Sequence, residues 1–149
     1  RRGKETVVVD NTQTLLEGEQ IIASKSATAM VSFGTASTFS ITPETVLTVV
    51  SSNPKNFLTQ LIKGTVAFET DEIVATISAR TLHGLFSISD GKATLSTGSE
   101  KKLIRFSIEE GTGNLGYIDT DNNTQSVEVK RGITLIFDDQ KRTFTVKPL

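Results

Sequence analysis

The feature of this sequence that most constrains its fold is an alternation of apolar and polar side chains that recurs along nearly the whole chain. In the run 38–42, Phe39 and Ile41 are apolar and their neighbours are polar. Successive side chains of a strand point to opposite faces, so such a run has one apolar and one polar face. The pattern recurs in the runs 28–33, 65–69, 73–77, 105–108, 126–129, 133–137 and 143–146. It predicts an all-β protein of about a dozen short strands, mainly antiparallel.

Turn-forming residues separate these runs at spacings of about 8–14 residues, which is typical of a sandwich, a roll or a twisted β-solenoid. The clearest hairpin is predicted at Asp90-Gly91, between the strands 86–88 and 93–95. The segment 53–62 fits a helical turn, but 58–64 also fits a strand that enters a turn, and the strand is preferred because its neighbours are strands. Further turns are predicted at 17–19, 34–35, 52–54, 63–64, 98–99, 119–123, 130–132 and 138–139.

Length and composition narrow the function. The 149 residues fit a single domain, 1–149, and the absence of cysteine excludes disulfides and thiolate chemistry. A net charge of -1, from 16 basic and 17 acidic residues, lacks the basic surplus that nucleic acid binding needs. No apolar run approaches the roughly 20 residues of a membrane-spanning helix. We expect no nucleic acid partner, and membrane attachment only through a segment outside this sequence.

The chain begins with Arg1-Arg2-Gly3-Lys4, which fits either the basic flank of a membrane helix or an arbitrary boundary. Valine, isoleucine and threonine make up about three residues in ten, and tryptophan is absent. Such a composition is common in secreted and surface β-proteins. It favours an extracytoplasmic location, in the periplasm or at the cell surface.

The residues that could support catalysis are better explained as turn residues. His83 is the only histidine, and no nucleophile-elbow motif accompanies it, so it is expected to be a hydrogen-bonding turn residue. The acidic pairs 71–72, 109–110 and 138–139 are adjacent in sequence, which sends their side chains to opposite faces of a strand. They are interpreted as solvated turns, and no catalytic residue is expected.

Neither a metal nor a cofactor is expected. The run Asp119-Thr120-Asp121-Asn122-Asn123 offers closely spaced oxygens for calcium, but it lacks the glycine and the distant glutamate of an EF-hand loop. A plain turn is the preferred interpretation. With Tyr117 as the only tyrosine and most phenylalanines at inward positions, an aromatic platform for sugars is not expected either.

The segment Glu5-Thr6-Val7-Val8-Val9-Asp10 is interpreted as a terminal strand. Two roles are open for it. It pairs within its own domain, as ordinary connectivity favours, or it adds to the open sheet edge of a neighbouring molecule.

Taken as a series, the glycine-punctuated strands resemble the FecR family, the extracytoplasmic signalling domain of bacterial iron-uptake regulators. The resemblance runs from about Leu15 to Phe137, with Gly84 followed by Leu85 where the family has threonine, and with 114–123 as an extra segment. Its motifs are Leu16-Glu17-Gly18-Glu19-Gln20-Ile21, the runs 26–33 and 39–45, Leu61-Ile62-Lys63-Gly64-Thr65-Val66-Ala67-Phe68, the run 77–88, Ser107-Ile108-Glu109-Glu110-Gly111 and Lys130-Arg131-Gly132.

The resemblance implies an all-β roll or solenoid outside the membrane, with an anchoring helix upstream. We therefore expect a non-catalytic bacterial protein-interaction domain that senses or signals through a protein partner. The alternative is a self-associating subunit of a surface assembly or filament that uses its N-terminal strand for β-augmentation.

Overall fold

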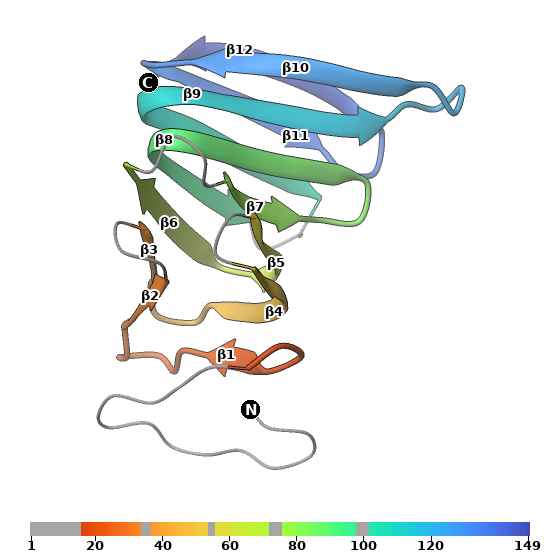
Figure 1. Ribbon diagram of the computed structural model, residues 1–149. Helices are drawn as coiled ribbons and strands as arrows, with labels where there is room; N and C mark the ends of the chain where they lie inside the picture. Colours follow the sequence, from red (N-terminus) through yellow and green to blue (C-terminus); the bar gives the residue numbers. More distant parts are fainter. Residues whose placement is uncertain (1–15, 34–36, 54–55, 72–75, 98–101) are drawn as a thin grey trace.

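The computed structural model describes residues 16–33, 37–53, 56–71, 76–97 and 102–149, and these form twelve strands in one sheet (Figure 1). In the part described, no helix is long and apolar enough to cross a lipid bilayer. The strands are β1 (Gln20–Ile22), β2 (Ala29–Phe33), β3 (Ser37–Ile41), β4 (Val46–Asn53), β5 (Asn56–Lys63), β6 (Thr65–Thr70), β7 (Thr76–Arg80), β8 (Gly84–Thr97), β9 (Leu103–Ile118), β10 (Thr124–Lys130), β11 (Ile133–Asp138) and β12 (Thr143–Pro148).

The sheet folds over into two layers because its two longest strands change partners halfway along. The first half of β8 pairs with β7 and its second half with β6. The first half of β9 pairs with β11 and its second half with β10, while β8 and β9 pair with each other on both sides of an irregularity near their middle. The first layer is therefore β1-β4-β5-β7-β8-β9-β10 and the second is β2-β3-β6-β8-β9-β11-β12. This confirms an all-β sandwich or roll, antiparallel except for the parallel pair β5–β7.

The hairpin predicted at Asp90-Gly91 is wrong, because β8 continues through these residues and only bends. The register between β8 and β9 is broken between Ser89 and Lys92, as in a β-bulge. Asp90 has a φ of 56°, and a Cβ on Gly91 would collide with the carbonyl oxygen of Glu110. The Asp-Gly pair thus turns the strand from one layer into the other, as bulges do at sandwich corners.

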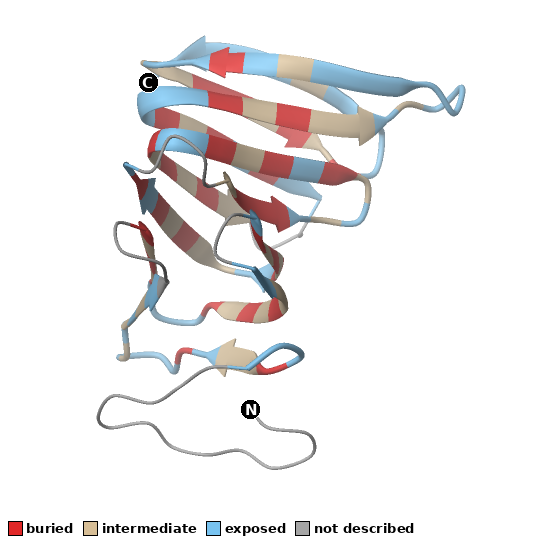
Figure 2. Cartoon of the chain, in the orientation of Figure 1, coloured by how far each residue is buried: buried red, intermediate tan, exposed pale blue. Residues whose placement is uncertain are grey.

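The core lies between the layers, where the alternation predicts it. Phe39 and Ile41 are both buried, and β5 confirms the strand preferred for 58–64 over a helical turn. Rings meet across the interior: Phe86 of the first layer lies 5.2 Å from Phe106 of the second, centroid to centroid. Figure 2 shows buried and less buried residues alternating along the central strands. The predicted N-terminal strand, the turns at 34–35 and 98–99, and parts of the runs 73–77 and 52–54 lie outside the described residues.

Candidate functional site

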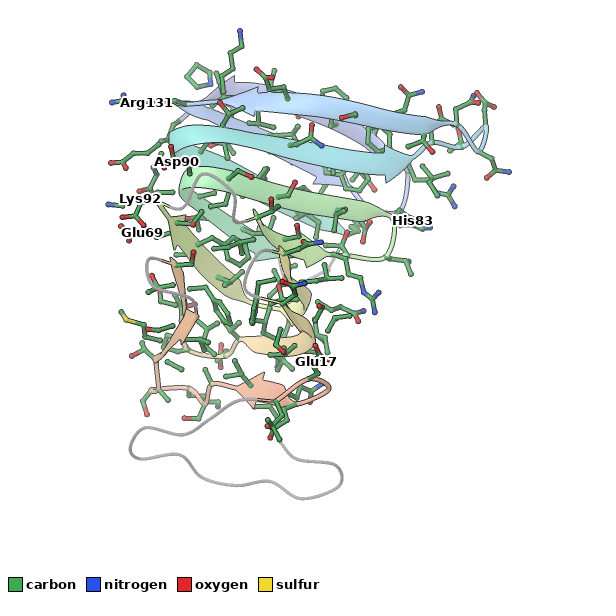
Figure 3. The ribbon with its side chains drawn as sticks, viewed as in Figure 1. Glu17, Glu69, His83, Asp90, Lys92 and Arg131 are labelled. Atoms are coloured by element: carbon green, nitrogen blue, oxygen red, sulfur yellow. The ribbon has the colours of Figure 1, made fainter. Side chains whose placement is uncertain are left out.

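The two edges of the folded sheet differ. On one side, the bends of β8 and β9 join the layers through the backbone, and Figure 3 shows Asp90 and Arg131 on this side. On the other side, where Figure 3 shows His83, the layers meet through the turns β7–β8 and β11–β12. We call the hydrogen bonds from residues 81–83 to Asp139 the Asp139 clasp.

In the Asp139 clasp, a buried carboxylate accepts three hydrogen bonds from one turn. The hydroxyl of Thr81 donates to Oδ1 over 3.1 Å, the N–H of His83 donates to Oδ1 over 2.8 Å, and the N–H of Leu82 donates to Oδ2 over 3.1 Å. The N–H of Asp139 itself donates to the carbonyl oxygen of Lys102 over 2.7 Å. The interpretation of 138–139 as a solvated pair is therefore wrong for Asp139, which is buried. Its carboxylate accepts the hydrogen bonds of the 81–83 turn that water would otherwise accept.

His83 and Asp139 lie together, but not in the arrangement of a catalytic pair. The Nδ1 atom of His83 contacts the backbone carbonyl oxygen of Asp139. Since a carbonyl only accepts, Nδ1 carries the proton. Nδ1 lies 3.8 Å from the Asp139 carboxylate, which is already occupied by backbone donors. The ring therefore adds a further link between the two turns, in agreement with the expected role of His83 as a turn residue.

The run 119–123 is a turn whose first carboxylate binds its own backbone. Asp119 Oδ1 accepts the N–H groups of Asp121 and Asn123, each over 2.9 Å. Asp119 Oδ2 accepts the side-chain amide of Gln125 over 2.8 Å. These bonds, from Gln125 first and then Asn123, hold the pKa of the Asp119 carboxyl below its usual value. No group of three or more acidic, histidine or cysteine side chains in the described chain is placed to hold a metal ion.

A guanidinium ties this turn to the other layer. Arg142, in the β11–β12 turn, donates from its Nη1 to the carbonyl oxygen of Asp119 over 3.1 Å. In the same turn Asp138 Oδ1 accepts the N–H groups of Gln140 and Lys141. These bonds, from Lys141 first, lower the pKa of Asp138. On the side of the molecule that carries the Asp139 clasp, side chains of the β11–β12 turn thus form hydrogen bonds with the two neighbouring turns.

The remaining polar candidates are scattered. Glu109 and Glu110 are exposed in the bulge of β9, not in a turn, because β9 runs on through them. Asp71 is exposed, and Glu72 lies outside the described residues. Tyr117 packs its ring 5.3 Å from Phe137 in the interior, so it is not a platform for sugars.

An open depression of about 260 Å³ lies on the outer face of the second layer, lined by strands β2, β3, β6, β8 and β9. The ammonium of Lys92 lies 3.6 Å from the carboxylate of Glu69 at its side, and both side chains are largely exposed. An exposed ion pair of this kind contributes little to stability. The depression is smaller than the roughly 300–1,000 Å³ of typical ligand pockets.

Comparison with known proteins identifies the class of fold rather than a sequence family. No protein-family model matches the chain, and neither does any curated protein. The two-layered all-β architecture is nevertheless found in solved structures. Two crystal structures of a putative anti-sigma factor from Parabacteroides distasonis ATCC 8503 share it, with TM-scores of 0.71 and 0.70.

Sequence identity to this protein is 11% and 12%, and the alignments cover 87% of the present chain. They cover 59% of the Parabacteroides chain, so the present chain spans about three fifths of its length. At this identity the likeness shows a shared fold.

Proposed function

We propose that this chain is a FecR-like domain of a bacterial anti-sigma regulator, which acts outside the cytoplasm by binding a protein partner and not by catalysis. The observation that carries the proposal is the fold shared with the Parabacteroides protein over 87% of this chain. The resemblance of the glycine-punctuated motifs to FecR regulators supports the same proposal from the sequence. Two independent features, backbone architecture and motif order, thus support the same class.

The use of polar side chains supports a role in recognition. The carboxylate of Asp139 and the ring of His83 are engaged in holding turns together. The carboxylate of Asp119 is engaged in the same way. A catalytic acid or base must instead face a site that substrate can enter. These side chains instead fix the turns in place, and a fixed set of turns supplies the pre-formed surface that the proposed binding to a protein partner requires.

The regulatory part of the proposal is tested in the source bacterium. The coding sequence for 16–149 is deleted from the chromosomal gene, and transcripts are compared with those of the parent and of a strain carrying Asp121→Ala, an exposed turn residue. We expect the deletion to change a limited set of transcripts that share one promoter class, because an anti-sigma regulator controls one sigma factor. Unchanged transcripts in the deletion strain would contradict the proposal.

The location is tested separately by adding protease to spheroplasts that express the tagged, full-length gene product. The proposal expects digestion of this segment in intact spheroplasts, while a cytoplasmic marker protein survives. Digestion only after lysis would place the segment inside and refute the extracytoplasmic assignment.

A further inference from the structure

The two layers end at β10 and β12 with apolar side chains uncovered. Val146 lies directly opposite the buried Leu135, so it faces the space between the layers, yet it is 56% exposed. Leu149 is 64% exposed, and Phe144 is only partly buried. Among the described strands, β12 pairs only with β11. Figure 2 shows β10 and β12 largely exposed at this end of the molecule. A strand added to the outer edge of β12 would cover these side chains and pair its backbone.

The charge on this edge favours an acidic strand. Residues 140–149 contain Lys141, Arg142 and Lys147 and no aspartate or glutamate. Pairing β12 with β12 of a second copy would bring these cations close together, and like charges on facing strands are destabilising. A strand that brings a carboxylate opposite Lys147 would instead match the charge within β12, and its apolar residues would cover part of the apolar surface.

The sequence contains a segment of carboxylates and valines at Glu5-Thr6-Val7-Val8-Val9-Asp10. In an antiparallel register that places Glu5 opposite Lys147, Thr6 falls opposite Val146, and Asp10 lies beyond the end of β12 at Thr143. Val8 then falls opposite Phe144, on the face toward the interior. An opposite-charge pair across strands, such as Glu5 with Lys147, contributes about 0.2–1 kcal/mol in general.

The chain between this segment and the first described residue is too short for the segment to reach β12 of its own molecule. Leu16 belongs to a turn that is held to β4, where the N–H of Gly18 donates to the carbonyl oxygen of Val49 over 2.8 Å. Along the paired strands β4-β5-β7-β8-β9-β11-β12, six strand spacings separate β4 from β12, or about 29 Å. Six residues from Asp10 to Leu16 span at most roughly 20 Å when fully extended. The acceptor must therefore be another copy.

We propose that residues 5–10 of one copy pair as a strand with the outer edge of β12 in the next copy. The first described strand, β1, and the acceptor strand β12 lie at opposite ends of the molecule in Figure 1. The contact is heterologous, and its repetition builds an open chain of copies. The inference is independent of the proposed function. The competing acceptor, β1 of the same chain, is preceded by Glu17 and Glu19, whose carboxylates repel those of Glu5 and Asp10.

Introduced cysteines test the contact directly, because the chain has none of its own. In the register given, Val7 lies opposite Thr145, so the doubly substituted chain, Val7→Cys with Thr145→Cys, is oxidised and run on a non-reducing gel. A ladder of disulfide-linked oligomers is expected. A mixture of the two single variants should give dimers. The control pair Val7→Cys with Thr94→Cys, which places the second thiol in the middle of the second layer, should give no ladder.

A disulfide-closed monomer from the Val7/Thr145 pair would show that the segment folds back on its own chain. It would overturn the proposal, and so would the absence of any ladder.

Charge reversal and truncation provide the second measurement, by size-exclusion chromatography with light scattering. The full chain should associate with rising concentration, and a chain lacking residues 1–10 should stay monomeric. Lys147→Glu should weaken association about fivefold, and Glu5→Lys in the same chain should restore it. Lys63→Glu, at the end of β5, should change nothing. Equal association of the truncated and full chains would refute the donor role.

Discussion

Replacing Asp139 by alanine should destabilise the protein far more than replacing any exposed aspartate. The change removes the acceptor of three donors, the Thr81 hydroxyl and the N–H groups of Leu82 and His83. A donor left without its partner in a buried site costs about 1–3 kcal/mol. The Thr81 hydroxyl keeps the carbonyl oxygen of Gly84 as an acceptor, so two N–H groups are left unpaired. Because this turn lies near the surface, we take the lower value for each, which gives about 2 kcal/mol in total. For a chain of this size that corresponds to a fall in Tm of about 4–8 °C.

The assay is urea unfolding followed by circular dichroism, with thermal melts in parallel. Asp139→Asn keeps one acceptor oxygen, so it should lose only about 1 kcal/mol. Asp121→Ala, in the exposed β9–β10 turn, is the matched control and should lie within about 0.5 kcal/mol of the parent. If Asp139→Ala unfolds at the same urea concentration as this control, then the clasp does not hold the layers together and the reasoning fails.

Three further predictions concern the bend, the turns and the core. Gly91→Ala should cost about 1–3 kcal/mol, because its Cβ would collide with a carbonyl oxygen of β9, whereas Gly116→Ala, with open space around it, should be near neutral; urea midpoints compare the two. The pKa of the Asp119 carboxyl is lowered in the folded state, so this group stabilises the fold at pH values above its usual pKa of 3.8 and loses that contribution as the pH falls through its folded pKa. In Asp119→Asn, the free energy of unfolding should therefore fall less steeply as the pH is lowered. Phe86→Ala, at a fully buried position, should cost about 3–5 kcal/mol by thermal unfolding, and a loss below 1 kcal/mol would mean that this ring is not in the core.

The strand faces could be predicted from the sequence because they depend on a local property, the period of two. Phe39, Ile41, Val66 and Phe68 are all buried at the positions that the alternation assigns to the interior. Val146 differs from these residues, because the alternation assigns its side chain to the interior but the structure leaves it exposed. Alternation says which face a side chain takes, and it does not say whether another strand covers that face.

The bend and the clasp could not be predicted, because both depend on distant partners. Asp90-Gly91 has the local chemistry of a hairpin turn, and only the neighbours of β8 on both sides reveal a bulge. A second acidic-glycine pair, Glu110-Gly111, lies on the adjacent strand with Gly111 at a φ of 74°. Two such pairs on neighbouring strands were the available signal. The donors of the clasp lie 56 to 58 residues from Asp139 along the chain, so nothing local marks its burial.

The clasp, the open end at β12 and the relation to the Parabacteroides fold all depend on β8 and β9 passing from one layer into the other. Nuclear Overhauser contacts between backbone protons of labelled protein test this passage directly. The structure predicts contacts of Ile88 with Gly113 and of Ala93 with Ile108, on the two sides of the bend. A hairpin at Asp90-Gly91 would instead place Ile88 beside Ala93. That contact, without the other two, would contradict the two-layered sheet described here.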